Sequence, residues 1–328
     1  MSTNLLTPGL CKLRKLGQTN IAVSPIGLGM MEFSGSKRPF NLAFPPIPQG
    51  QKNDILKATL DGGINWFDTA ELYGFGESER TTVAALKANA MQPGQVVVAT
   101  KWFPLLRTAR NIPRSVENRL RFLEGFPIDL YMVHLPFGLS SPEAEMNAMA
   151  DLVEAGKIRS VGVSNFSAER MRRAHAALEK RGLPLAVNQM EYSLLNRKIE
   201  RDGVLQAAKE MGVTIIAYTP LASGVLSGKY HQDPTLLRRA KSYRRSLLPR
   251  LIERSKPLIE AMRGLAEKYQ VSLAQIALNW VIHFQGETVV AIPGATRVEQ
   301  AGQNAGAMKF KLSEEDLNRL DVLSREFQ

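Results

Sequence analysis

Six polar side chains occupy the same place in six successive units of the chain, each at the end of a short, β-branched apolar run. They are Asp68, Lys101, His134, Ser164, Gln189 and Tyr218. A single polar residue at a strand end is usually a helix cap or a satisfied structural group. When parallel strands alternate with helices, the carboxyl ends of all strands meet at one face. The repeated placement therefore predicts that these side chains share one cavity.

The residue types at these positions favour proton transfer. Tyr73 follows Asp68 by five residues, so the intervening loop can fold its phenol back over the strand ends. A free phenol has a pKa of about 10, which we expect the Lys101 ammonium to lower while the Asp68 carboxylate keeps that ammonium charged. His134 can hydrogen-bond a substrate oxygen. These four groups predict a general acid beside an oxyanion site, as reduction of a carbonyl requires.

Such a reduction also needs a hydride, which no amino-acid side chain donates, so a dinucleotide cofactor is expected. The chain has no Rossmann fingerprint, because the segment 27–32 (GLGMME) lacks the third glycine, and it has no Walker-type loop. We therefore expect the dinucleotide to bind across the strand ends. There Ser164, Asn165 and Gln189 offer groups for the carboxamide, and the Tyr218 ring can stack on nicotinamide.

The elements that position these residues repeat along the chain. The carboxyl ends of the six runs fall at residues 68, 101, 134, 164, 189 and 218, which are 25 to 33 residues apart. One strand, one crossover helix and two loops need about 30 residues. Two further runs, at 24–29 and 289–292, complete eight. Helices are predicted over 77–88, 115–123, 142–155, 168–180, 203–211, 257–269, 272–284 and 314–323.

Eight such units without a break in composition predict one α/β domain over residues 1–328, a (β/α)8 TIM barrel. Lys12 to Val23 is expected to form an N-terminal β-hairpin ahead of the first strand, with its turn at Gly17-Gln18-Thr19-Asn20. The interval between Tyr218 and Thr288 is too long for one unit. We expect extra elements near the C-terminus, a basic loop followed by helices.

The charge distribution narrows the range of partners. The formal charge is +11, and seven basic residues against one acidic residue between Leu237 and Arg254 contribute over half of it. No zinc-finger, RNA-binding aromatic or basic-heptad pattern accompanies this stretch. It therefore indicates a solvated basic face or a site for a phosphorylated ligand rather than a nucleic-acid partner.

Cysteine content and hydropathy bear on the compartment. The single cysteine, Cys11, excludes an internal disulfide and suits a reducing environment. The chain shows no secretory signal pattern and no apolar run long enough to span a membrane. We expect a cytoplasmic protein without a membrane partner. No metal site is predicted, and the oligomeric state is left open.

The chain resembles the aldo-keto reductase family over nearly its whole length, from Leu13 to Leu323. The resemblance rests on separated motifs in the family's order. They are 63–70 (GINWFDTA) with Tyr73-Gly74, Thr100-Lys101, 129–134 (DLYMVH), 156–166 (GKIRSVGVSNF), 188–193 (NQMEYS), 217–230 (AYTPLASGVLSGKY) and 292–296 (IPGAT). Each motif alone is weak, but together and in order they are specific.

The resemblance implies a catalytic tetrad of Asp68, Tyr73, Lys101 and His134, a small-molecule carbonyl substrate, and NADPH (NADP+) as cofactor. It implies nicotinamide contacts from Ser164, Asn165, Gln189 and Tyr218. Along the pyrophosphate it places Thr219, Leu221, Ser223, Gly224, Leu226 and Lys229. For the adenosine 2′-phosphate it places Gly294, Thr296, Arg297, Gln300, Gln303 and Asn304. The Arg297 guanidinium suits a phosphate that NADH lacks, and the basic stretch after Tyr230 could close over the cofactor.

The substrate side departs from the better-known members. The loop from Met30 to Gln49 is long and apolar, and it is expected to border the substrate pocket with Trp102, Phe103 and Phe137. Ordinary loop packing is the competing explanation for these aromatic side chains. Because few residues follow the helix predicted at 314–323, we expect the chain to lack the long substrate loop of steroid-type members. Aldehydes, including aromatic and sugar-derived ones, are therefore expected as substrates before steroids.

Two other functions would use the same residues. An NAD-linked alcohol or polyol dehydrogenase would run toward oxidation, with Tyr73 as the base. A cofactor-sensing binding protein, like the channel-associated β subunits that share this fold, would also keep the tetrad. The sequence leaves open the natural substrate, the direction of the reaction and the strictness of the preference for NADPH.

Overall fold

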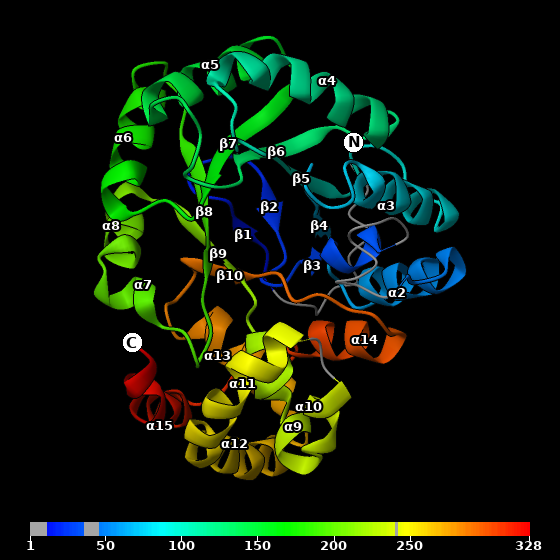
Figure 1. The fold of residues 1–328 in the computed structure, drawn as a ribbon, viewed down its shortest axis with the longest axis vertical. Helices are drawn as coiled ribbons and strands as arrows, with labels where there is room; N and C mark the ends of the chain where they lie inside the picture. Colours follow the sequence, from blue (N-terminus) through cyan, green and yellow to red (C-terminus); the bar gives the residue numbers. More distant parts are fainter. Residues whose placement is uncertain (1–11, 36–45, 240–241) are drawn as a thin grey trace.

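Eight parallel strands form the centre of the molecule (Figure 1). The computed structural model describes residues 12–35, 46–239 and 242–328. The strands pair in chain order, which confirms the predicted (β/α)8 barrel architecture. They are β3 (Leu28–Gly29), β4 (Trp66–Asp68), β5 (Val97–Trp102), β6 (Ile128–Val133), β7 (Ile158–Ser164), β8 (Leu185–Glu191), β9 (Thr214–Tyr218) and β10 (Val289–Ala291).

Backbone hydrogen bonds join the first strand region to the last. Gly27 N donates to Ala291 O at 2.8 Å, and Ala291 N donates to Pro25 O at 2.9 Å. Parallel bridges pair Ile26 with Ala291 and Gly29 with Gly294. The edge groups of β3 and β10 are satisfied in this way, so the sheet closes on itself.

The predicted hairpin is present and fills one end of the barrel. β1 (Arg14–Lys15) pairs antiparallel with β2 (Ala22–Val23). Its apolar residues Leu16, Ile21 and Val23 are buried in one cluster with barrel residues that include Trp66 and Leu130. The hairpin crosses the centre of the ring in Figure 1. It lies at the amino-terminal ends of the strands and leaves the carboxyl-terminal end as the mouth.

Helices surround the sheet, and most begin and end within a few residues of their predicted bounds. They are α2 (Gln49–Asp61), α3 (Glu77–Ala88), α4 (Ile112–Leu123), α5 (Pro142–Glu154), α6 (Ala168–Glu179), α7 (Lys198–Arg201), α8 (Val204–Met211), α12 (Lys256–Tyr269), α13 (Leu273–His283), α14 (Val298–Gly306) and α15 (Glu314–Ser324). Short 3-10 turns are η1 (Met31–Ser34), η2 (Ala109–Asn111), η3 (Ala222–Ser227) and η4 (Arg325–Phe327). None of the described helices is both long and apolar enough to cross a bilayer.

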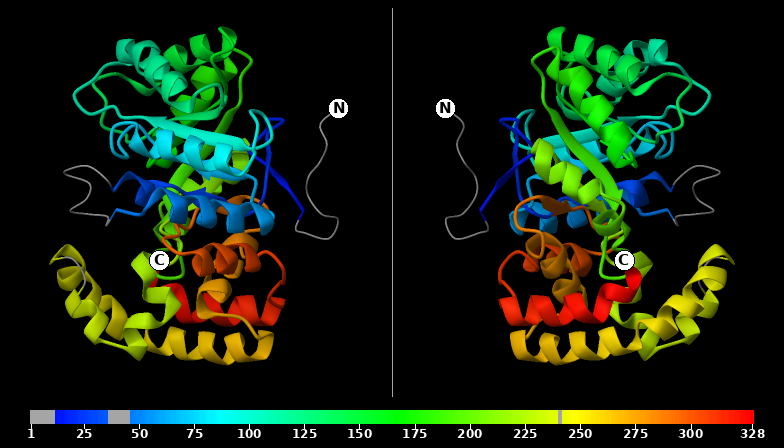
Figure 2. Two further views of the ribbon diagram at one scale, coloured as in Figure 1. Left: turned by 90° about the vertical axis from the view of Figure 1, so that its right-hand side faces the viewer. Right: turned by 90° about the vertical axis from the view of Figure 1, so that its left-hand side faces the viewer.

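Besides the short α7, three parts of this helical layer were not predicted. α2 and α14 lie in segments for which the sequence predicts no helix. The expected basic loop is largely helical, as α9 (Lys229–Gln232), α10 (Thr235–Arg239) and α11 (Ser242–Arg254). α11 extends on the side of the molecule opposite the hairpin, which is the side of the barrel mouth (Figure 2). Residues 36–45 of the predicted apolar loop lie outside the described residues.

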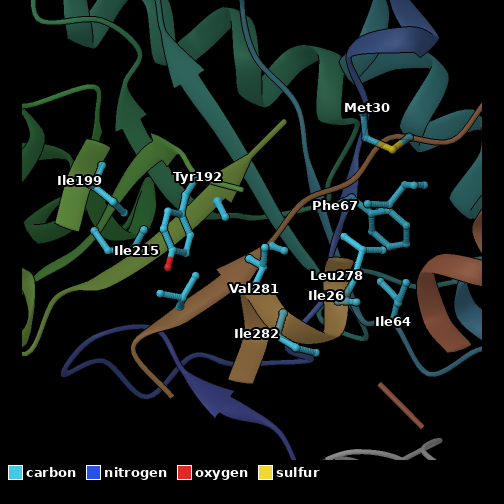
Figure 3. Packing of buried hydrophobic residues seen from close by; sticks show 14 of the residues in the cluster. Ile26, Met30, Ile64, Phe67, Tyr192, Ile199, Ile215, Leu278, Val281 and Ile282 are labelled. Atoms are coloured by element: carbon cyan, nitrogen blue, oxygen red, sulfur yellow. The ribbon is translucent and has the colours of Figure 1, made fainter. Parts of the chain in front are cut away.

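Strand alternation divides the core into two layers. On β5, Ala99 belongs to the cluster inside the barrel, whereas Val98 and Trp102 belong to the cluster between the strands and the helices. Figure 3 shows part of this outer cluster, to which Ile64, Phe67, Leu278 and Val281 belong. Because successive strand residues face opposite layers, Lys101 faces the interior and Thr100 the helices.

Gly27 offers a direct test of the packing at the barrel seam. A β-carbon at Gly27 would lie 2.3 Å from the ring of the buried Trp66, whose indole N–H donates to Ser24 O. We expect Gly27→Ala to lower the free energy of unfolding by about 1–3 kcal/mol, because the ring cannot yield without disturbing the barrel core. Urea unfolding followed by circular dichroism measures the change.

Gly264→Ala is the matched control. A β-carbon at Gly264, inside α12, meets nothing within 4 Å. This variant should be neutral or more stable by about 0.5–1 kcal/mol, because alanine favours a helix over glycine. Equal stability of Gly27→Ala and the parent protein would contradict the packing described here.

Candidate active site

A buried ion pair lies at the centre of the mouth. The Lys101 ammonium on β5 donates to Asp68 Oδ2 at 2.5 Å and to Thr69 O at 2.8 Å. The Gln189 amide on β8 donates to the other Asp68 oxygen, Oδ1, at 2.9 Å. Lys101 and Asp68 are almost completely shielded from solvent. Burial lowers the pKa of Lys101, and the Asp68 carboxylate opposes that shift.

Tyr73 and His134 complete a compact group around this pair. The Lys101 ammonium lies 5.1 Å from the centre of the Tyr73 ring. The rings of Tyr73 and His134 meet edge-on, with centroids 5.7 Å apart and planes at 83°. The turn after β4 places Tyr73 here, because Tyr73 N donates to Ala70 O and Ser78 N donates to Tyr73 O. The structure thus brings together the four residues that the sequence predicted as a tetrad.

The pKa of the Tyr73 phenol differs from the sequence expectation. It is raised well above its usual value, first by burial and then by the negative charges of Asp68 and Glu32 and by Tyr218. From the sequence we expect Lys101 to lower this pKa. That prediction was wrong in sign, because loss of solvation of the phenolate outweighs the attraction of an ammonium already paired with Asp68. Tyr73 is therefore protonated at neutral pH.

His134 is neutral in the same environment. Burial, and then the positive charge of Lys101, lower the pKa of the His134 imidazole to about 3. Its Nδ1 atom is buried and has no hydrogen-bond partner among the described residues. A neutral imidazole beside a protonated phenol can hydrogen-bond a polar oxygen without adding charge to the cavity.

A chain of hydrogen bonds links the predicted nicotinamide contacts to this group. The Tyr218 hydroxyl donates to Asn165 Oδ1 at 3.0 Å, and Asn165 Nδ2 donates to Ser164 Oγ at 2.9 Å. The Ser164 hydroxyl donates to Gln189 O at 3.0 Å. Since Gln189 also bonds Asp68, these side chains form one connected surface from β9 to β4.

The predicted pyrophosphate residues lie on a loop with a strained backbone. Thr219, Ala222 and Ser223 have φ angles of 52°, 47° and 55°, in the left-handed region that disfavours side chains. Gly224 follows with φ 89°. A β-carbon there would lie 2.8 Å from Lys229 Nζ, so only glycine lets this lysine fold back over η3. Leu221 and Leu226 lie on the same segment.

The predicted 2′-phosphate residues gather at the start of α14. Arg297 is the N-cap residue and is exposed. Thr296 N donates to Gln300 Oε1 at 2.8 Å, and Asn304 Nδ2 donates to Gly294 O at 3.3 Å. Gln303 lies on the same helix. A helix start with an arginine beside it favours an anionic group.

The three predicted pocket aromatics have different surroundings. The Phe103 ring lies 6.3 Å from His134, at 71°, and Phe137 is exposed on the loop after β6. Trp102 is completely buried, and its indole N–H donates to Asn111 Oδ1 at 3.0 Å. Trp102 follows the inward-facing Lys101 by one residue, so strand alternation directs it to the helix layer rather than to the mouth.

Sequence reasoning missed a cluster of charged groups behind β5. Glu71 accepts from Phe103 N and from Arg107, and Glu79 lies 3.2 Å from Arg119 Nε. Arg119 and Glu79 are almost completely buried. Their positions in amphipathic helices make them look like ordinary solvated charges. The available signal was the spacing of Glu71 and Glu79 around Tyr73.

A separate cavity of about 660 Å3 lies among α9 to α12 and shares no residue with this group. Charged side chains that line this cavity pair with one another, since Lys256 donates to Glu253 and Arg263 donates to Glu260. The strand-end group, with its buried ion pair and shifted pKa values, remains the candidate active site.

Comparison with known proteins agrees with this geometry. The sequence profile of the Aldo/keto reductase family matches residues 25–325. The chain belongs to the aldo/keto reductase family. A probable aldo-keto reductase 1 of Glycine max is 32% identical over 313 residues, which span 93% of this chain and 87% of that relative.

Solved structures of the family share the fold. An aldo-keto reductase from Klebsiella pneumoniae in complex with NADPH is 28% identical, with a TM-score of 0.73 and 95% of each chain covered. The glycerol dehydrogenase of Gluconobacter oxydans is 26% identical, with a TM-score of 0.78, and the match covers 98% of this chain and 97% of that one. Members with different names therefore share this barrel.

The state of His134 can be measured directly. We expect its imidazole nitrogen resonances to stay those of a neutral ring from pH 5 to pH 8, because its pKa lies at about 3. Nitrogen-15 NMR of the four histidines tests this, with His134→Gln assigning the signal. An unfolded histidine has a pKa of about 6.5. Above pH 6.5 the imidazole is neutral in both the folded and the unfolded protein, so its titration does not change the free energy of unfolding. As the pH drops from 6.5 toward 3, only the unfolded protein binds this proton, and the free energy of unfolding falls. Titration of His134 within pH 5–8 would contradict this.

Proposed function

We propose that this protein reduces aldehydes and ketones to alcohols with NADPH, and that Tyr73 donates the proton. The observation that carries the proposal is the buried Lys101–Asp68 pair beneath the Tyr73 ring. Hydrogen bonds tie that pair through Gln189 to the predicted nicotinamide contacts. A proton donor and a dinucleotide surface that share one network are what hydride reduction of a carbonyl needs.

The roles follow from the geometry. Bound NADPH would supply the hydride that adds to the carbonyl carbon. Tyr73 gives its phenolic proton to the carbonyl oxygen, and the phenolate left behind is stabilised by the Lys101 ammonium. Asp68 keeps that ammonium charged and in place. The neutral His134 hydrogen-bonds the carbonyl oxygen and so favours the charge that develops there.

The described residues fit the cofactor. Lys229 folded over the strained η3 loop, and Arg297 at the start of α14, are cations suited to the pyrophosphate and the 2′-phosphate. The related Klebsiella pneumoniae protein binds NADPH in its crystal structure. α11 lies on the mouth side in Figure 2, where the basic stretch can approach the cofactor.

The main alternative is an alcohol or polyol dehydrogenase, which the likeness to the Gluconobacter oxydans glycerol dehydrogenase favours. In that direction Tyr73 must act as a base. Its raised pKa keeps the phenol protonated at neutral pH, which suits a proton donor better than a base. Initial rates with NADPH and an aldehyde, against NAD+ and a polyol, separate the two functions.

Tyr73→Phe tests the proton donor. We expect kcat for aldehyde reduction to fall by about two to four orders of magnitude, because only proton transfer is removed. NADPH binding, followed by fluorescence titration, should stay within about twofold. Tyr269→Phe is the control and should keep full turnover, because it removes a phenol at the end of α12 that donates to Asp316 in α15. Unchanged turnover in Tyr73→Phe would refute the assignment.

Arg297→Ala tests whether Arg297 contacts the 2′-phosphate of NADPH. We expect the preference for NADPH over NADH to narrow by about 1–3 kcal/mol, the range of a charge-assisted hydrogen bond. Kd values for both cofactors measure it. Lys309→Ala removes an exposed cation beyond the other end of α14 and should leave both values unchanged. An equal loss of affinity for NADPH and NADH would mean that Arg297 does not contact the 2′-phosphate.

A further inference from the structure

A second carboxyl group, Glu79, is buried behind the active-site strand. It lies in the first turn of α3 and is completely shielded from solvent. Its Oε1 accepts a hydrogen bond from Thr100 Oγ1 at 2.7 Å and lies 3.2 Å from Arg119 Nε. Its other oxygen has no hydrogen-bond partner among the described residues. A buried carboxyl group with one unsatisfied oxygen lowers the stability of the fold. Its presence at this position therefore needs an explanation.

The position of Glu79 relative to Lys101 explains why a carboxyl group is buried here. Thr100 precedes Lys101 on β5, and neighbouring strand residues face opposite layers. Asp68 therefore contacts Lys101 from inside the barrel, while Glu79 holds the preceding residue from the helix layer. The negative charge of Glu79 raises the pKa of Lys101, in addition to the larger contribution of Asp68.

We propose that Glu79 is a positioning residue for Lys101: it anchors β5 through Thr100 and adds a second negative charge beneath the ammonium, so that carbonyl reduction depends on the charge of Glu79. This inference rests on the proposed function, because it matters only if the Lys101 ammonium supports proton transfer from Tyr73.

The surroundings of Glu79 make its charge responsive to pH. Burial raises the pKa of Glu79 to about 7, against the lowering effects of Arg119 and the Thr100 hydrogen bond. Glu71, on the loop after β4, raises this pKa further, and Arg80 on α3 lowers it. Glu79 therefore gains its charge as the pH rises through neutrality.

Other ionisable groups face the same space. Tyr131 on β6 lies near Glu71, Arg119 and Glu79, and burial raises its pKa well above the usual value of a phenol, so it stays neutral. Arg119 on α4 also lies 4.0 Å from Glu71. Of the acids in this cluster, Glu79 is the one whose pKa is placed near 7. Once ionised, Glu79 opposes the lowering of the Lys101 pKa that burial causes.

Glu79→Gln is the decisive variant, because glutamine keeps the volume and an acceptor for Thr100 but removes the charge. The measurement is kcat against pH at saturating NADPH and aldehyde. Without the charge, Lys101 loses its proton at a lower pH. We expect the alkaline limb of the profile to move down by about one pH unit, which is about tenfold in kcat on that limb, with KM for the aldehyde little changed.

Glu145→Gln is the matched control. Glu145 on α5 is equally buried, and burial also raises its pKa to about 7, but the charge that faces it is Arg170. Its profile should superimpose on that of the parent protein. Arg119→Met is the second variant if Glu79→Gln does not fold. Removing this cation keeps Glu79 neutral to higher pH, so the limb should shift in the same direction.

The outcomes separate this inference from the proposed function. A uniform fall of kcat at every pH in Glu79→Gln, with the limb unmoved, would overturn the inference and leave Glu79 as a structural residue. The same holds if Arg119→Met leaves the limb in place. If Tyr73→Phe is inactive and the alkaline limb of Glu79→Gln does not move, only the role of Glu79 is refuted. A fully active Tyr73→Phe refutes the proposed function itself.

Discussion

The arrangement at the mouth depends on keeping one ammonium charged where water cannot reach it. Moving Lys101 and Asp68 out of solvent carries a desolvation cost of several kcal/mol per ion, which their attraction offsets only with good geometry and further hydrogen bonds. Thr69 O and the Gln189 amide supply those bonds from β4 and β8. Because Gln189 on β8 is 121 residues from Asp68 in the sequence, its bond to the pair forms only when the barrel brings β8 and β4 to the same mouth. Barrel closure is therefore the condition for the site.

Strand alternation then decides which neighbours of the pair serve the cavity. Lys101 faces inward, so Thr100 and Trp102 face the helix layer. The same rule explains why Trp102 packs in the core with Asn111 while Phe103 lies near His134. It also brings the helix α3 into electrostatic contact with the mouth, since Glu79 reaches Thr100 across the sheet from Asp68. The helix layer of this barrel thus does more than cover the strands.

Much of this organisation could be predicted from the sequence, because spacing and strand ends are local signals. The strands, the hairpin, most helices and the meeting of Asp68, Tyr73, Lys101 and His134 followed from them. The helices α2 and α14, and the helical state of the basic stretch, did not, since their patterns are weak and tertiary packing decides. The direction of the Trp102 side chain could have been predicted, because Trp102 is the neighbour of the inward-facing Lys101 on one strand. The pKa of Tyr73 could not, because its sign depends on how far burial outweighs a paired charge.

That raised pKa bears on how the site can work. In the proposed reduction, a phenol held neutral by burial would give up its proton only when a negative charge develops on a nearby oxygen, which happens during hydride addition and not before it. In the same proposal, the Lys101 ammonium beneath the Tyr73 ring would stabilise the phenolate that remains. A site with Tyr73 ionised at rest would lose the donor, and a site with Lys101 neutral would lose the stabilising charge. Burial pushes Tyr73 and Lys101 toward their neutral forms, and this suits the tyrosine but opposes the lysine. The carboxylates Asp68 and Glu79 act on that second problem, which is why both lie against the strand that carries Lys101.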